Sequence, residues 1–390
     1  MKKSLISLLL WFLVFFQGTA QPFEIGHTTI NFVDPDRNNR QVSTEVYYPA
    51  DMAGDDVPFS LQFTLPVPLV VFGHGFLMVW SAYENIWSAL VPQGYIVAFP
   101  TTESSLSPNH DEFGKDLAFV VRAASALSGN QASLFYQRID TMACVMGHSM
   151  GGGSACLAAA GEPMIQAIAT LAPAETTPSA KAAAAGINIP SLIFAGGNDC
   201  VTPPPAHQVP IYDSLASTCK TYISITGGSH CQMAEYNFYC NLGESTCTPP
   251  PAISRPQQHI VINRYLIPWL AFFLKGDASA GALFDQTLQG DPEILTTKNC
   301  SLVLGFQDQN LAIRHKISVY PNPFTQFFRV DLPDNMPGTF TLYDPVLRKI
   351  NEIQVQGSAI IPIEETVSGL LIYTFRTANG TMVSGKILKR

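Results

Sequence analysis

Short apolar runs alternate with helical patterns through most of this 390-residue chain, and this alternation constrains its fold more than any other feature. The apolar runs are rich in Val, Ile, Leu, Phe and Ala and end at Gly, Pro or a polar residue, as buried parallel strands do. They occupy residues 69–73, 95–100, 142–147, 167–172, 191–196 and 222–226. Helical patterns fit residues 82–92, 113–127, 150–160, 206–217 and 257–274. The sequence therefore predicts an α/β fold.

Residues 28–48 show a different pattern, which predicts antiparallel edge strands with Asn38 and Asn39 at the turn between them.

A composition of 47% hydrophobic and 13% charged residues indicates a globular chain with a sizeable core. The net charge is −8 and no basic run is present. Neither nucleic acid nor an anionic membrane surface is therefore expected as a partner.

The first twenty residues have the form of a secretory signal. Lys2 and Lys3 precede an apolar run at 5–16, and small residues end at Ala20. That run is too short and wrongly flanked for a membrane span. We expect cleavage after Ala20, no membrane span, and a secreted or cell-surface protein that passes through the periplasm.

The pattern changes near Leu304. From Ile317 onward the chain shows short alternating strands with Pro and Gly turns and no helical pattern. We predict a signal peptide at 1–20, a catalytic domain at 21–307, a linker at 308–316 and a small all-β sandwich domain at 317–390.

The segment 147–151 reads GHSMG and fits the G-x-S-x-G nucleophile elbow of the α/β-hydrolase fold. The predicted strand 142–147 precedes it and a helix rich in small residues follows, as this motif requires. The alternative interpretation is that these glycines only mark the start of a helix and have no catalytic role. We predict that Ser149 is a nucleophile.

A nucleophilic serine needs a histidine base, and the histidine needs a carboxylate to orient it. In this fold the acid and then the histidine follow the serine, each just after a strand. Asp199 follows the strand 191–196 and His230 follows the strand 222–226, so we predict them as acid and base. The remaining histidines do not follow a late strand, and His148 within the elbow should point away from Ser149.

The oxyanion formed in such a reaction needs two backbone N–H donors. Met150, directly after the nucleophile, supplies one. Phe76 lies in the loop after the strand 69–73 and is the candidate for the other; the alternative is that Phe76 is a core aromatic. No cofactor or metal is needed.

These stretches resemble bacterial cutinases and poly(ethylene terephthalate) hydrolases of the dienelactone-hydrolase-like branch. The resemblance rests on GHSMGGG at 147–153, IPSLIFAGGND at 189–199, PIYDS at 210–214 and GGSH at 227–230. It implies an α/β-hydrolase core and an ester or polyester substrate. It also implies that Phe76, Met150 and Val201 contact the substrate.

Two departures from that family stand out. The family's polyester hydrolases carry a tryptophan after the sixth strand, but residues 170–190 contain no aromatic, so Trp80 is the candidate replacement. The segment 231–251 is longer than usual and holds three cysteines.

The tail resembles the C-terminal sorting domain of type IX secretion, found in Bacteroidota. Its opening motif matches VYPNPF at 319–324, and its end matches GLLIY at 369–373 and the terminal KILKR. The resemblance implies the type IX secretion machinery as a partner. The alternative is a β-sandwich accessory domain that binds substrate or partner.

The chain has eight cysteines, and in an exported protein cysteines are expected to form disulfides rather than metal or redox sites. Cys144 and Cys156 sit in an apolar strand and the next helix and are expected to stay free and buried. A metal site of His230, Cys231, Cys240 and Cys247 is the alternative to disulfides.

The pairing follows from the expected site. Because Asp199 must reach His230, the next residues, Cys200 and Cys231, are expected to form one bridge. Cys240 and Cys247 would form a second, local bridge. The competing pairing joins Cys231 to Cys240 or Cys247 and leaves Cys200 for Cys219.

Taken together, the sequence predicts a monomeric serine carboxylic-ester hydrolase that works through an acyl-enzyme. Two alternatives remain: a serine peptidase on the same fold, and a surface binding protein with a catalytically inactive core.

Overall fold

The computed structural model describes residues 23–63, 65–302, 318–332, 337–344, 348–363, 369–377 and 382–389. The predicted signal peptide and the predicted linker lie outside these residues. The chain divides into two compact units. The first comprises Met1–Ile187, Ile193–Ala216 and Gly227–His259; the second comprises Asn188–Leu192, Ser217–Thr226 and Ile260–Arg390.

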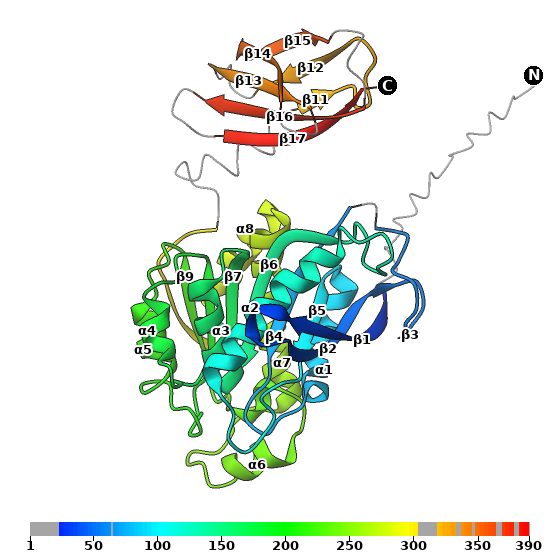
Figure 1. Ribbon diagram of the computed structural model, residues 1–390. Helices are drawn as coiled ribbons and strands as arrows, with labels where there is room; N and C mark the ends of the chain where they lie inside the picture. Colours follow the sequence, from blue (N-terminus) through cyan, green and yellow to red (C-terminus); the bar gives the residue numbers. More distant parts are fainter. Residues whose placement is uncertain are drawn as a thin grey trace, which may run out of the picture. The chain divides into compact units, whose positions relative to one another are not determined.

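A ten-stranded sheet organises the α/β part of the molecule, in the order β10-β9-β8-β7-β6-β4-β5-β2-β1-β3 (Figure 1). All six predicted buried strands lie in it. The strands are β1 (Glu24–Asp34), β2 (Arg40–Ala50), β3 (Gly54–Asp55), β4 (Val67–Gly73), β5 (Ile96–Pro100), β6 (Ile139–His148), β7 (Ile165–Leu171), β8 (Ser191–Gly196), β9 (Lys220–Ile225) and β10 (Ile294–Lys298).

The centre of the sheet is parallel, whereas most of the strand pairs toward its two edges are antiparallel, with the short β1–β3 pair as a parallel exception. β4 pairs in parallel with β5 and β6, and β6 with β7, whereas β1–β2, β2–β5 and β9–β10 are antiparallel. Every residue of β4, β5 and β8 is buried, which explains why these strands read as continuous apolar runs. The mostly parallel sheet with crossing helices confirms the predicted α/β class.

Helices connect the strands. They are α1 (Glu84–Leu90), α2 (His110–Leu127), α3 (Met150–Gly161), α4 (Ala180–Ala184), α5 (Gln208–Ser214), α6 (Phe238–Glu244), α7 (Arg255–Lys275) and α8 (Ala278–Leu288). The predicted helix 82–92 is instead a short α1 between two 3₁₀ turns, Trp80–Tyr83 and Val91–Gln93. Pro92 lies in the second turn, where it has no N–H to continue the helix. The short elements α4 and α6, the helix α8 and the edge strand β10 were not predicted.

The predicted antiparallel pair is confirmed, because β1 and β2 form a hairpin over their full lengths. Asn38 and Asn39 have φ of 53° and 54°, in the left-handed region that asparagine tolerates better than most residues.

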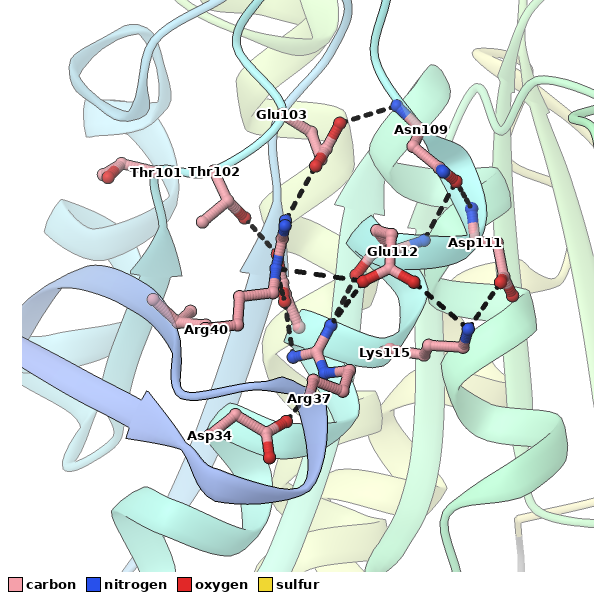
Figure 2. Close-up of polar contacts among 12 residues, drawn as sticks. Asp34, Arg37, Arg40, Thr101, Thr102, Glu103, Asn109, Asp111, Glu112 and Lys115 are labelled. Carbon is pink, nitrogen blue, oxygen red and sulfur yellow. Dashed lines mark hydrogen bonds and ion pairs between the residues drawn. The ribbon is translucent and has the colours of Figure 1, made fainter.

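A cluster of charged side chains fastens this hairpin turn to α2 (Figure 2). The fully buried carboxylate of Asp116 in α2 pairs with Arg37 at 2.6 Å and with Arg40 at 2.7 Å. The hydrogen bond to Asp116 holds the pKa of Arg40 above its ordinary value. Since a buried carboxylate is tolerated only when it is paired, the cluster accounts for the burial of Asp116.

The described C-terminal residues form two antiparallel sheets, as the all-β expectation predicts. One has the order β11-β12-β15, and the other β14-β13-β16-β17. Side chains of both sheets share one hydrophobic cluster that includes Phe328 and Phe340. The strands are β11 (Ser318–Tyr320), β12 (Phe327–Asp331), β13 (Pro337–Tyr343), β14 (Lys349–Gln356), β15 (Ser358–Pro362), β16 (Gly369–Thr377) and β17 (Met382–Lys389).

Among the described residues, no helix has both the length and the hydropathy needed to span a bilayer.

Candidate active site

Ser149 lies at the sharp turn between β6 and α3, as expected for the elbow. Its backbone has φ 56° and ψ −122°, a conformation that L-residues with side chains rarely adopt. The turn is held by hydrogen bonds from the Ser149 N–H to the carbonyl of Leu171 at 3.0 Å and from the Ala174 N–H to the Ser149 carbonyl at 2.9 Å.

The flanking glycines are required by contact with backbone. A Cβ on Gly147 would lie 2.3 Å from the carbonyl oxygen of Gly151, and one on Gly151 would lie 2.1 Å from that of Gly73. Because both obstructing atoms belong to backbone, no side chain can move aside. The two glycines thus let β6, α3 and the end of β4 approach each other closely.

Asp199 follows β8 and is almost completely buried. Its Oδ1 accepts hydrogen bonds at 2.8 Å from the backbone N–H groups of both Val201 and Thr202. Its Oδ2 accepts the Nδ1–H of His230 at 2.8 Å and the hydroxyl of Thr202 at 2.9 Å. The structure therefore brings together the two residues that the sequence suggested as acid and base.

Close backbone packing joins the loops that carry Asp199 and His230. The Asn198 N–H donates to the Gly228 carbonyl at 2.8 Å, and a Cβ on Gly196 would lie 2.8 Å from the backbone of Ser229. The buried side chain of Gln258 in α7 binds both the N–H and the carbonyl of Ser229, each at 2.8 Å. The backbone just before His230 is thereby fixed.

A cleft of about 380 Å³ opens beside these residues. Ser149 and His230 both line it, together with Phe76 and Val201, which the resemblance had suggested as substrate contacts. The other lining residues, which sequence reasoning missed, are Leu77, Met78, Tyr239, Cys240, Leu242 and Gly243.

Two of the residues expected to contact substrate do not line this cleft. Met150 is buried at the start of α3. Trp80 lies in an aromatic cluster, with ring centroids 6.1 Å from Tyr47 and 5.9 Å from Trp87. Packing against these rings buries part of the indole, and Trp80 is not among the residues that line this cleft.

The helix α6 forms one wall of the cleft and places the aromatic ring of Tyr239 there. Tyr239 is 58% exposed and Leu242 is 59% exposed, although both are large. Four of the ten lining residues come from this seven-residue helix. Its short length and its mixture of polar, apolar and cysteine residues gave no periodic signal from which it could be predicted.

The predicted disulfide pairing is wrong. Cys200 pairs with Cys247, Cys231 with Cys240, and Cys219 with Cys300. A 3₁₀ turn begins at Cys231, and the Cys231 N–H donates to Glu244 of α6, so this cysteine meets α6 rather than Cys200. The bridges therefore tie α6 to the loop of His230, and the segment just after α6 to the loop of Asp199.

The remaining cysteines behave as expected. Cys144 and Cys156 are free and buried, and burial raises the pKa of both thiols, that of Cys156 to about 12. The metal alternative fails, because its three cysteines are all in disulfides.

The loop after β4, where Phe76 lies, is fastened to the elbow by Tyr83. The buried Tyr83 hydroxyl accepts the Gly75 N–H at 2.7 Å and lies 3.0 Å from Nδ1 of His148. The next residue after Phe76, Leu77, has a φ of 55°. The backbone around Phe76 is therefore held in a defined and partly strained shape.

His148 packs on the candidate base, with ring centroids 4.6 Å from His230. Burial, and then the neighbouring His230, keep the pKa of His148 well below its ordinary value. His148 therefore stays neutral at neutral pH and places no positive charge against the His230 ring.

The large, mostly parallel sheet and the strand–turn–helix at Ser149 are consistent with the class of α/β-hydrolases. The chain belongs to the PET hydrolase-like family, whose sequence profile matches residues 17–280. That match includes Ser149, Asp199 and His230.

Named relatives are similar to part of the chain. A bis(hydroxyethyl) terephthalate hydrolase of Streptomyces coelicolor is 29% identical over 210 residues, 53% of this chain and 57% of that protein. The cutinase est1 of Thermobifida alba is 35% identical over 163 residues, 41% of this chain and 52% of that protein. The chain thus spans about half the length of the curated relatives it matches.

Proposed function

We propose that this protein is a serine carboxylic-ester hydrolase that cleaves esters or polyesters through an acyl-enzyme. One observation carries the proposal: Ser149 and His230 line the same cleft, and a buried carboxylate holds the far side of the His230 ring. Membership of the PET hydrolase-like family supports ester bonds as the target.

The hydrogen bond from His230 Nδ1–H to Asp199 leaves Nε2 free to accept a proton. As Ser149 Oγ attacks the ester carbonyl, His230 takes the hydroxyl proton and becomes an imidazolium that Asp199 stabilises. The His230 imidazolium then gives this proton to the departing alkoxide. Water repeats the sequence on the acyl-enzyme and releases the acid, so no cofactor takes part.

The negative oxygen formed in each step requires backbone donors. We assign this role to the N–H groups of Met150 and Phe76. Met150 is the first residue of α3, where the N–H groups are not used within the helix and the helix dipole favours negative charge.

The cleft wall suggests the substrate class. Phe76, Val201, Tyr239 and Leu242 give the cleft an apolar surface suited to the acyl or aromatic part of an ester. Relatives named as cutinases and as a bis(hydroxyethyl) terephthalate hydrolase support esters of this kind. We therefore propose apolar and aromatic esters, including polyesters, as substrates.

Purified protein should be assayed with short p-nitrophenyl esters, a bis(hydroxyethyl) terephthalate ester, polyester film and peptides. Hydrolysis of the esters and not of the peptides is the expected result. Peptide cleavage would favour a serine peptidase, and the absence of any turnover would favour a surface binding protein.

Replacing Tyr239 with Ala tests the proposed aromatic contact. Because an aromatic pair contributes about 0.5–1.5 kcal/mol, we expect KM for aromatic esters to rise about 2- to 10-fold. KM for a short aliphatic ester should change little. Tyr236→Ala is the matched control, because Tyr236 is also exposed but does not line the cleft. Equal effects of the two substitutions would argue against a specific contact at Tyr239.

We further propose that the chain is exported as a monomer. In this proposal residues 1–20 are a signal peptide, 21–307 the catalytic domain, 308–316 a linker and 317–390 a type IX sorting domain. The protein would cross the periplasm and reach the cell surface or medium. Two observations support the division: the family match ends at residue 280, and the C-terminal strands have their own hydrophobic cluster.

Deleting residues 317–390 should separate catalysis from export. The truncated protein is expected to keep its ester turnover, because the cleft lies entirely within residues 76–243. It should accumulate inside the outer membrane of a host with type IX secretion, as measured by activity in cell fractions and medium. Loss of soluble, active protein on truncation would contradict the proposed domain boundary.

A further inference from the structure

Thr202, three residues after the candidate acid, is buried against both Asp199 and His230. Its hydroxyl oxygen lies 2.9 Å from Oδ2 of Asp199 and 2.9 Å from Nδ1 of His230. No other described side chain has a hydrogen bond to both of these residues.

A second buried residue determines how the Thr202 hydroxyl is oriented. Gln208, the first residue of α5, is fully buried. Its Nε2 donates to the Pro173 carbonyl at 2.8 Å and to the Thr202 hydroxyl oxygen at 3.1 Å. The two amide hydrogens are thereby both used.

These contacts determine which acceptor receives the hydrogen of the Thr202 hydroxyl. A hydroxyl has one hydrogen and two lone pairs. One lone pair accepts from Gln208 and the other faces the Nδ1–H of His230, so the hydrogen is left for Asp199. The other acceptor within reach, the Ala172 carbonyl, is farther away at 3.4 Å.

With that hydrogen in place, the carboxylate of Asp199 is fully satisfied. It accepts two backbone N–H groups at Oδ1, and the Thr202 hydroxyl and His230 Nδ1–H at Oδ2. An ionised carboxylate offers about four such positions. Loss of the hydroxyl would leave one of these positions empty and one N–H of the Gln208 amide without an acceptor, in a site with little access to water.

We propose that Thr202 is a positioning residue for the acid–base pair, with its hydroxyl orientation set by Gln208. The hydroxyl holds Oδ2 of Asp199 in line with the imidazole and shares the Nδ1–H of His230, which keeps Nε2 directed toward Ser149. The inference rests on the proposed function, in which these residues act as acid, base and nucleophile.

The turn at Asp199 does not need this hydroxyl. The backbone N–H of Thr202 already donates to Oδ1, and this bond survives any side-chain substitution at the position. A role limited to the fold of the turn therefore predicts little change when only the hydroxyl is removed, whereas a positioning role predicts slower chemistry.

Two pairs of variants isolate the hydroxyl. Wild type and Thr202→Val have nearly the same shape, and Thr202→Ser and Thr202→Ala differ by the hydroxyl alone. Because a hydrogen bond to a charged group is involved, we expect kcat to fall about 10-fold or more in the Val and Ala variants. KM should stay within about twofold, and Ser should recover most of kcat. If the Val variant does not fold, the Ser–Ala pair still decides.

A readout that does not depend on turnover is the proton resonance of the His230 Nδ1–H, recorded in the same four proteins. We expect it to move in the Val and Ala variants and to keep its position in the Ser variant. An unmoved resonance with unchanged kcat in the Val or Ala variant would overturn the proposal, and so would a Ser variant as slow as Ala. If Ser149→Ala left ester turnover intact, the proposed function would fail instead, while the resonance would still report on Thr202.

Discussion

Replacing Ser149 with Ala is expected to lower ester turnover by about 10⁴-fold or more, and His230→Ala should do the same. Without the hydroxyl no acyl-enzyme forms, and without the imidazole no group takes the proton from Ser149. Because the two residues act as one unit, their effects should not add, and the turnover of the double variant should be close to that of either single variant. Steady-state assays with a p-nitrophenyl ester measure these losses.

A matched control lies five residues farther along the chain. Ser154 of α3 is buried and donates to the His110 carbonyl, and it does not line the cleft. Ser154→Ala removes the same atom as Ser149→Ala and should leave turnover nearly unchanged. Substantial activity in a correctly folded Ser149→Ala protein would show that another residue is the nucleophile.

Removing the Cys200–Cys247 bridge is expected to have the second largest effect. The bridge closes a loop with a sequence separation of 47 residues. The chain-entropy estimate for such a loop is about 4 kcal/mol of unfolding free energy. Neighbouring bridges already constrain this loop, so we expect the double variant Cys200→Ser, Cys247→Ser to lose about 2–4 kcal/mol. Thermal or denaturant unfolding measures the loss.

The same variant should also bind substrate less well. The bridge joins the segment just after α6 to the loop that contains Val201, and both α6 and Val201 line the cleft. A rise in KM is therefore expected at temperatures where the variant is still folded. The control is Cys219→Ser, Cys300→Ser. This bridge closes a larger loop, with a separation of 81 residues, and neither of its cysteines is adjacent in sequence to a residue that lines the cleft. The control variant should lose comparable stability and keep its KM. An equal change of KM in both double variants would contradict a specific role of the first bridge.

The order of secondary structure could be predicted because the central strands are buried on both faces. Such strands become continuous apolar runs, as in β4, β5 and β8, and the glycines and polar residues at their ends mark where the chain turns. Helices were located less accurately. The regions predicted as 82–92 and 206–217 contain helices of only seven residues, because 3₁₀ turns take up part of the first and α5 spans only Gln208–Ser214.

The residues Ser149, Asp199 and His230 could be selected from sequence because each follows a strand, in the order that this fold requires. The carboxyl ends of neighbouring parallel strands meet at one edge of a sheet, so the order along the chain predicts proximity in space. In the structure Asp199 accepts a hydrogen bond from His230, and His230 and Ser149 line the same cleft.

Thr202 and Gln258 carried no comparable signal. One is an ordinary threonine beside prolines, and the other is a glutamine within a long helix. Their importance lies in hydrogen bonds to residues that are distant along the chain, such as those of Gln258 to Ser229 and of Thr202 to His230. Only the packed structure shows that these polar atoms are buried and that each has a partner.

The sequence by itself determined the α/β class, the all-β tail and the three residues of the candidate site. These features depend on local patterns: the burial of short runs, the glycines of one turn and the position of a residue after its strand. The tertiary structure alone decided the disulfide pairing and the cleft wall formed by α6. It also decided that Trp80 lies in the aromatic cluster with Tyr47 and Trp87 and does not line the cleft. The physical reason is that each depends on distances between segments far apart in the chain, and those distances are set by how all the elements pack together.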